Sequence, residues 1–381
     1  MKIAFYLNLH GSGHCRRFEA VARHLPEDFE LAVMGMNKLP PIRNIDRRVI
    51  RIKLPGFGPN SDNAFVEQQT SHAYHDFKVN HGDNTAFTLA MVNFFSQWQP
   101  DLVVSDVGLE ASVLARMCGL PVVYTRQHGT RWDKGHTLAY EWACSLWAPF
   151  ATEMEQHDCP VWIRNKTFYS GGFSRFSGLE KPKHPPICYS EDKANILVMT
   201  GFGGTSITLG DIAAAAAANP QWRWHIAGLR PSTKLDKLPK NMICHGVIRD
   251  VWPYLCHADL VVANAGHNSV MEIAAAGRPF LCVPAARPFA EQQCKARVLR
   301  DLKLGVIRQR WPESTDWPDI FAQAAAQDLS LWEKLQDADA ARRSADYLSQ
   351  IARLCDRTSP DVLPSPPDLP AVKRKTGASA A

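Results

Sequence analysis

Short apolar segments alternate with helical patterns along the first half of the chain. The segments KIAFYL, ELAVMG, RVIRIKL, DLVVSD and PVVYTR are rich in Val, Ile and Leu, and helical patterns such as FEAVARHL and GLEASVLARMCG lie between them. Strands that are apolar on both faces and alternate with helices are typical of a parallel sheet covered by helices. The pattern therefore predicts a Rossmann-like domain over residues 1–170.

The same alternation restarts after residues 171–192, a stretch dense in Gly, Pro and Ser that is typical of a linker. NILVMTG, WRWHIAG, ADLVVANAG and PFLCVP predict strands, and IAAAAAAN and SVMEIAAAG predict helices. We predict a second doubly wound α/β domain over 193–318, a helical segment over 319–356 and a disordered tail over 357–381. Open α/β sheets bind ligands at the carboxyl ends of their strands, so we expect the site in a cleft between the two domains.

Composition narrows the class of protein. Apolar residues make up 45% and charged residues 21% of the 381 positions, as in soluble globular proteins. The net charge of +5 comes from scattered basic residues, which favours anionic small molecules over nucleic acid. The ten cysteines include no CxxC pair, which predicts reduced thiols. No apolar run approaches the roughly 18 residues that span a bilayer, so we expect a cytoplasmic protein.

The stretch ANAGHNSVMEIAAAGRPFLCVPAARPFAEQQCKA, residues 263–296, is the most informative motif. It predicts a strand that ends at Ala263 and a helix that begins near Asn268 or Ser269, with Glu272 in its first turn. Backbone N–H groups at such a helix start, together with the Ser269 hydroxyl and the Asn268 amide, suit a diphosphate. The alternative is an ordinary N-capped helix with an early glutamate.

The spacing of this motif resembles the nucleotide-sugar glycosyltransferases of the GT-B fold, especially the plant UDP-dependent enzymes and the N-acetylglucosaminyl transferase that forms lipid II. The matching positions are Gly266, Asn268, Ser269, Glu272, Gly277, Pro279, Glu291, Gln292 and Ala296. The resemblance implies that Gly266, Asn268 and Ser269 contact the donor diphosphate. It also implies that Glu272 binds the ribose and that Glu291 and Gln292 bind the sugar. His267, Glu291 and Lys295 depart from the family pattern, which leaves the sugar open.

Two further stretches extend the resemblance on the donor side. The turn GFGGTS, residues 201–206, follows a predicted strand and resembles the phosphate-facing turn of the lipid II enzyme, which implies phosphate contacts from Gly203, Gly204 and Thr205. A plain strand-to-helix connection is the alternative. In GVIRDVWPYLCHAD, residues 246–259, the position of Ile248 implies that its backbone binds the base.

The stretch LHGSGHCRR near the N-terminus has Arg16 where the dinucleotide fingerprint GxGxxG needs its last glycine, which disfavours a dehydrogenase. In the resembled families a histidine in this turn points toward the acceptor, and His14 takes that position. Asp106 stands where the plant enzymes have the aspartate that partners this histidine. A histidine with a pKa near neutrality can take the proton of an attacking hydroxyl. A structural histidine and, for Asp106, a helix cap are the alternatives.

The acceptor side is less defined. Gly13 lies in the histidine turn, and TRQHGTRWDKG, residues 125–135, offers Arg126 and His128 for an anionic acceptor or as ordinary loop charges. The aromatic stretch AFTLAMVNFFSQW, residues 86–98, predicts a buried helix and leaves peripheral contact with the inner face of the membrane as a weaker alternative.

Two sequence features favour an inverting reaction without a metal ion or a cofactor. The close Asp-x-Asp pair, Asp337 and Asp339, lies in the C-terminal helical segment, and Asn264 stands where many retaining GT-B enzymes have a glutamate. The predicted activity is transfer of a sugar from a nucleotide sugar, most simply UDP-linked, to an acceptor hydroxyl. The sequence does not identify the acceptor, and lipid-linked and polymeric acceptors in the synthesis of cell-envelope glycans both agree with it. One alternative is a nucleotide-sugar hydrolase of the pseudaminic acid pathway type. Such hydrolases have a glycine-histidine turn followed by an arginine, and Gly13, His14 and Arg17 resemble that pattern. Another is a non-catalytic nucleotide-sugar-binding protein.

Overall fold

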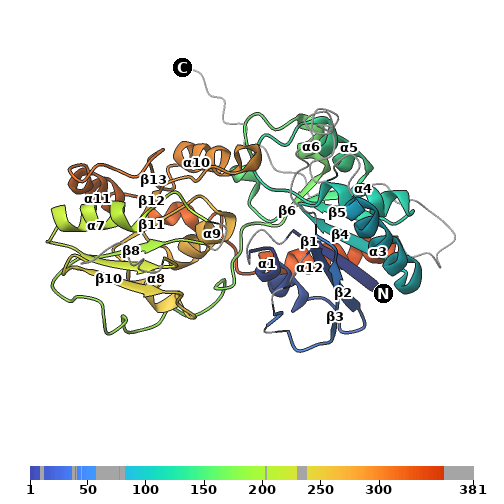
Figure 1. Ribbon diagram of the computed structural model, residues 1–381, viewed down its shortest axis with the longest axis horizontal. Coiled ribbons are helices and arrows are strands. Elements are labelled where there is room, and N and C mark those ends of the chain that lie inside the picture. Colours follow the sequence, from blue (N-terminus) through green and yellow to red (C-terminus); the bar gives the residue numbers. More distant parts are fainter. Residues whose placement is uncertain are drawn as a thin grey trace, which may run out of the picture.

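The computed structural model describes residues 1–8, 13–36, 39, 41–43, 45–56, 77, 82–201, 204–229 and 238–355. Two parallel sheets, each flanked by helices, form two α/β domains that lie next to each other (Figure 1). The predicted fold class, a pair of doubly wound α/β domains, is therefore confirmed. The expected linker, residues 171–192, runs from one sheet to the other without a helix or a strand.

The first sheet has seven parallel strands in the order β3-β2-β1-β4-β5-β6-β7. They are β1 (Lys2–Leu7), β2 (Glu30–Met36), β3 (Val49–Leu54), β4 (Leu102–Asp106), β5 (Val122–Thr125), β6 (Ser145–Ala148) and β7 (Thr167–Tyr169). The helices of this part of the chain are α1 (Gly13–Ala22), α3 (Gly82–Trp98), α4 (Leu109–Met117), α5 (Lys134–Trp142) and α6 (Val161–Lys166), with a 3-10 turn η1 (Thr152–Met154). The five strands that the sequence predicted are all present, and β6 and β7 extend the sheet.

The second sheet has six parallel strands in the order β10-β9-β8-β11-β12-β13. They are β8 (Asn195–Met199), β9 (Arg223–Ala227), β10 (Met242–Gly246), β11 (Leu260–Ala263), β12 (Phe280–Cys282) and β13 (Val306–Ile307). The helices are α7 (Leu209–Ala218), α8 (Trp252–His257), α9 (His267–Ala276), α10 (Glu291–Asp301) and α11 (Trp317–Ala325), with 3-10 turns η2 (Pro288–Ala290) and η3 (Leu329–Trp332). Its central strands are completely buried, as continuous apolar runs require.

The C-terminal helical segment is divided between the two domains. Trp317 of α11 packs edge-on against Trp224 of the second sheet, with the ring centroids 4.7 Å apart. Helix α12 (Ala340–Leu354) instead returns to the first domain, where Tyr347 stacks on Phe168 at 3.9 Å and the helix packs against α1 (Figure 1). Small and apolar residues recur at helical spacing along the buried face of α12, which explains this docking. The predicted tail, 357–381, lies outside the described residues.

The aromatic helix α3 covers the first sheet just before β4. Its side chains Phe87, Met91, Phe94 and Phe95 are buried in the core shared with strands β1 and β4, which confirms the predicted buried helix. Among the described residues, no helix combines the length and the apolar character that crossing a membrane requires.

Candidate functional site

A cavity of about 1020 Å³ lies between the two domains, at the carboxyl ends of strands from both sheets. Asn8 and Val107 line it just after β1 and β4, and Thr200 and Asn264 line it just after β8 and β11. Of the predicted site residues, the following line this cavity: Gly13, His14, Gly204, Ile248, Gly266, Asn268, Ser269, Glu272, Glu291 and Gln292. That volume is at the upper end of the range typical of small-molecule sites.

His14 and Asp106 form the predicted pair on the first-domain wall. Helix α1 begins at Gly13, which places His14 in its first turn, while Asp106 ends β4 next to β1. The His14 Nδ1 atom lies 3.0 Å from Asp106 Oδ2. Helix α4 begins at Leu109 without a side-chain cap, so the alternative of Asp106 as a helix cap is wrong.

Arg17 is the residue that sequence reasoning did not connect to this pair. It lies three residues after His14, hence on the same face of α1, and its Nη1 donates to Asp106 Oδ1 at 3.0 Å. Burial by itself would raise the pKa of the Asp106 carboxyl, but the charges of Arg17 and His14 outweigh burial and lower that pKa. Asp106 is therefore ionised at neutral pH.

The start of α9 forms the opposite wall. The helix begins at His267 with Gly266 as its N-cap and without a side-chain cap, which contradicts the alternative of an ordinary capped helix. Glu272 consequently lies in the second turn and not in the first, because the helix begins one or two residues earlier than predicted. The Asn268 side chain donates to the Gly13 carbonyl at 3.1 Å and so joins the two domains across the cavity.

Glu272 is held by Arg175, a residue of the inter-domain segment that sequence reasoning missed. The Arg175 Nε atom lies 2.8 Å from Glu272 Oε1, and both residues line the cavity. Burial raises the pKa of the Glu272 carboxyl, and Arg175 partly opposes that effect. Sequence spacing gave no signal for this pair because 97 positions separate its members.

The remaining donor-side predictions differ in outcome. Gln292 is buried at the cavity, where its Oε1 accepts from the Ala285 N–H at 2.9 Å. The Glu291 Oε2 atom lies 3.9 Å from Arg131 Nη2. Thr205 uses its Oγ1 to accept from the Ile207 N–H at 3.0 Å, so it shapes the turn rather than the cavity wall. Gly203 lies outside the described residues.

Arg126 and His128 do not lie at the cavity wall, contrary to their predicted place on the acceptor side. Arg126 is 1% exposed and pairs with Glu155 at 2.6 Å, and His128 is 2% exposed with its Nε2 2.8 Å from the Met154 carbonyl. Side chains alternate in direction along extended backbone, so Gln127 between them lines the cavity instead.

Lys295 and His267 form a buried pair behind the cavity wall. The Lys295 Nζ atom lies 2.9 Å from His267 Nδ1, and Lys295 is 1% exposed. Burial lowers the pKa of Lys295 to about 7; Glu291 raises that pKa and Arg17 lowers it further. Burial also lowers the pKa of His267, so the imidazole is neutral and accepts a hydrogen from the amine.

This pair predicts a pH-dependent stability that the variant K295M lacks. Unfolded lysine keeps its proton to about pH 10.4, whereas folded Lys295 releases it near pH 7. Between these values the unfolded chain binds more protons, so the free energy of unfolding rises with pH, by at most about 1.4 kcal/mol per pH unit for one group. Urea unfolding of both proteins from pH 7 to 8.5 measures the difference. Parallel curves for wild type and K295M would contradict the assignment.

Comparisons with known proteins agree with this architecture. A family described as "Glycosyltransferase family 28 C-terminal domain" matches residues 229–314. An uncharacterized glycosyltransferase of Methanosarcina acetivorans is 29% identical over 236 residues, which cover 55% of this chain and 61% of that protein. The UDP-N-acetylglucosamine--N-acetylmuramyl-(pentapeptide) pyrophosphoryl-undecaprenol N-acetylglucosamine transferase of Granulibacter bethesdensis is 31% identical over 181 residues, 44% of this chain and 46% of that protein. The chain thus spans between about half and three fifths of these relatives.

Solved structures show the same fold at low sequence identity. The crystal structure of Acinetobacter baumannii MurG has a TM-score of 0.58 and 16% identity, covering 92% of this chain and 99% of that one. The spinosyn rhamnosyltransferase SpnG, complexed with thymidine diphosphate, has a TM-score of 0.57 and 14% identity, covering 93% of this chain and 96% of that one. Two parallel sheets with a cavity between them are the hallmark of the GT-B fold, and this chain has that fold. Within the second domain, residues 229–314 match the C-terminal domain of glycosyltransferase family 28.

Proposed function

We propose that this protein is an inverting, metal-independent glycosyltransferase that moves a sugar from a nucleoside-diphosphate sugar to an acceptor hydroxyl. The observation that carries the proposal is the contact between His14 and Asp106 on a cavity whose other wall is the start of α9. Inversion by direct displacement needs a base on one side of the anomeric carbon and stabilisation of the leaving diphosphate on the other. The two walls offer these two functions from different domains.

The base in this mechanism is neutral His14. Its Nδ1 atom lies 3.0 Å from the ionised Asp106; in the proposal Nδ1 carries the hydrogen, which leaves the Nε2 lone pair to take the acceptor proton. As the acceptor oxygen forms its bond to the anomeric carbon, the bond from that carbon to the diphosphate oxygen breaks and the diphosphate leaves. Asp106 stabilises the imidazolium that forms, and Arg17 keeps Asp106 ionised.

The leaving diphosphate lies at the N-terminus of α9 in this proposal. Free backbone N–H groups, the helix dipole and the Ser269 hydroxyl all favour negative charge there. Gly204 lines the same cavity, and its carbonyl accepts from Arg287 at 2.6 Å, which joins two loops around the phosphate position. Glu272 and Ile248 contact the nucleoside, and Glu291 and Gln292 contact the sugar.

We expect a UDP-linked sugar to stabilise the protein selectively in a thermal-shift panel of UDP-, dTDP- and GDP-sugars, because a ligand that binds only the folded state raises Tm. The variant S269A should lose about 1.5 to 3 kcal/mol of that stabilisation, as expected for one hydrogen bond to a charged group. S349A is the matched control, because Ser349 is a buried serine on α12 that bonds the Ala345 carbonyl. Absence of a shift with every nucleotide sugar, or an unchanged shift in S269A, would overturn the donor site.

Turnover assays separate transfer from the other two activities that the motifs allow. Transfer requires an added acceptor, whereas rapid release of free sugar from the donor alone would identify a hydrolase. Tight donor binding with neither reaction would identify a binding protein. Lipid-linked and polymeric acceptors are both included in the assay because the residues of the first-domain wall do not identify the acceptor.

A further inference from the structure

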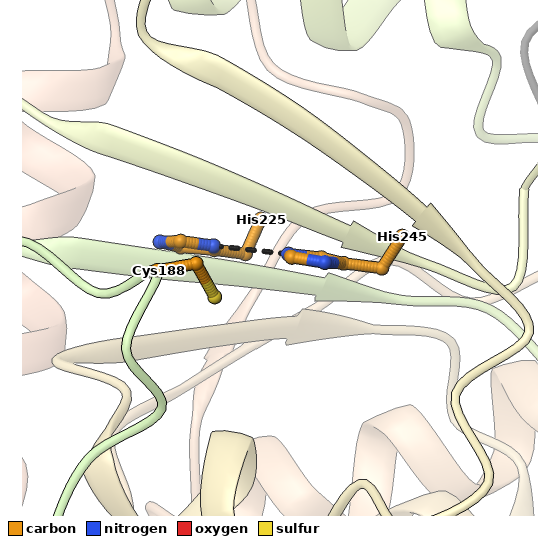
Figure 2. A group of neighbouring side chains, drawn as sticks. All are labelled: Cys188, His225 and His245. Atoms are coloured by element: carbon orange, nitrogen blue, oxygen red, sulfur yellow. Dashed lines mark hydrogen bonds between the residues drawn. The ribbon is translucent and has the colours of Figure 1, made fainter.

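Cys188, His225 and His245 lie close together on one face of the second sheet, and the proposed sugar transfer uses none of them. Their ligand atoms all lie within 4.8 Å of one another. Figure 2 shows the two imidazoles end to end, joined by a hydrogen bond, with the Cys188 side chain beside them. We infer that these three side chains form a binding site for one zinc ion.

The sheet itself brings the two histidines together. His225 lies on β9 and pairs in register with Ile243 of the neighbouring edge strand β10. The register then shifts between Cys244 and Gly246, and the irregularity falls on His245. His245 follows Ile243 by two residues, so the alternation of side chains along a strand places it on the same face as His225, with 3.1 Å between His245 Nε2 and His225 Nδ1.

The inter-domain segment supplies the sulfur. Tyr189 packs its ring 4.3 Å from the His225 ring, and its hydroxyl donates to the Tyr254 carbonyl of α8 at 2.8 Å. These contacts fix the segment over the same face of the sheet, and Cys188 immediately precedes Tyr189. The three ligands thus come from three separate segments, β9, β10 and the linker.

Asn195 prepares His225 as a ligand. The Asn195 Oδ1 atom lies 3.2 Å from His225 Nε2 and also accepts from the Ser190 N–H at 2.8 Å, which fixes its orientation as an acceptor. His225 must therefore hold its hydrogen on Nε2, so the Nδ1 lone pair points toward His245. A hydrogen bond from the second ring nitrogen to an acceptor is the usual support of a metal-binding histidine.

The chemistry of the three ligands suits zinc. Burial lowers the pKa of His225 to about 3 and lowers that of His245, so both imidazoles are neutral and have a lone pair at pH 7. One thiolate and two imidazoles match the borderline softness of zinc better than calcium or magnesium, which prefer oxygen ligands. On binding, Cys188 releases its proton and the hydrogen that His245 holds on Nε2 moves to Nδ1. A water completes the four ligands.

The distances require a modest closure. Zinc bonds of about 2.0 to 2.3 Å place tetrahedral ligand atoms roughly 3.3 to 3.7 Å apart, so two ligand atoms at the 4.8 Å limit must close by about 1 Å. Cys188 and His245 are half-buried and His225 is buried, so the first two move while His225 stays. The ion would then tie the linker to the edge of the second sheet.

This site adjoins the nucleoside end of the cavity. Gly246 follows His245 and its carbonyl accepts from the Gly228 N–H at 2.7 Å, and Gly228 and Ile248 both line the cavity. The three proposed ligands do not line it, so the ion has a structural role. A zinc ion bound at this site would stiffen the loop that holds Ile248.

Metal titration of the full chain tests the inference. After chelator treatment, the wild type should take up one equivalent of Zn²⁺, with a rise in Tm, and Co²⁺ in its place should give a thiolate-to-cobalt charge-transfer band. C188S should lose the band, and both C188S and H245A should lose at least tenfold in affinity. C244S, one residue from His245, and H184A, an exposed histidine of the same linker, are matched controls that should keep both.

Two results would overturn the site. One is a wild type that takes up no Zn²⁺ with micromolar or tighter affinity, and the other is a cobalt band that survives in C188S. Tm of each variant without metal separates loss of ligands from loss of folding, and the wild-type stoichiometry needs no variant. Either result would leave the two histidines as a hydrogen-bonded pair. The outcome is independent of sugar transfer, because the assay measures metal and not activity.

Discussion

Replacing His14 with alanine is expected to lower kcat for sugar transfer by about 10²- to 10⁴-fold, the usual contribution of a general base. The dissociation constant for the donor should change less than twofold, because His14 lies on the first-domain wall and the proposed diphosphate site lies on the second. Asp106 keeps its partner Arg17 in H14A, so the carboxylate is not left buried without a counter-charge. Single-turnover rates with saturating donor, together with donor thermal shifts, measure the two quantities separately.

D106N and H24A complete this experiment. D106N removes the charge that stabilises the imidazolium while it keeps the size of the side chain, so the rate should fall and the donor affinity should persist. His24 is an exposed histidine just after α1, and H24A should transfer sugar at the wild-type rate. A rate for H14A near that of wild type would remove His14 as the base. Equal losses of rate and of donor stabilisation would indicate damage to the fold instead.

The sequence predicts those parts of the molecule that local pattern determines. Buried parallel strands are continuous apolar runs, so KIAFYL, DLVVSD, NILVMT and ADLVVA each become a strand of a sheet. His14 and the α9 motif could be located because they directly follow such strands. Parallel strands end at one edge of a sheet, and residues placed after them meet there whatever their separation in the chain.

Side-chain pairs that form between distant segments cannot be predicted from the local sequence pattern. Arg175 comes to Glu272, and Lys295 comes to His267, through packing of loops and helices that no periodicity describes. The docking of α12 on the first domain is of the same kind: its amphipathic face predicts burial but not the surface that buries it. The sequence also does not show the direction of a side chain at the end of a strand, so it predicts Arg126 on the acceptor side, whereas the structure buries it.

Arg126 gives the sharpest test of this difference, because a structural role and an acceptor role predict opposite results for R126M. Its guanidinium is buried with Glu155 at 2.6 Å and donates to Thr167 Oγ1 at 3.0 Å. Removing one member of a buried ion pair leaves the other charge uncompensated and costs about 3 to 5 kcal/mol. We therefore expect R126M to lose about that much free energy of unfolding in urea, with Glu155 as the cause.

The double variant R126M/E155M separates the ion pair from the rest of the site. Removing both charges takes away the uncompensated carboxylate, so the double variant should recover most of the loss, because a well-packed apolar pair is often as stable as a buried ion pair. Q127A is the matched control, since Gln127 follows Arg126 but lines the cavity, and it should alter KM for the acceptor with little change in stability. If R126M instead unfolds like wild type and raises the acceptor KM, Arg126 contacts the acceptor after all. The buried ion pair between Arg126 and Glu155 would then have to open during the reaction.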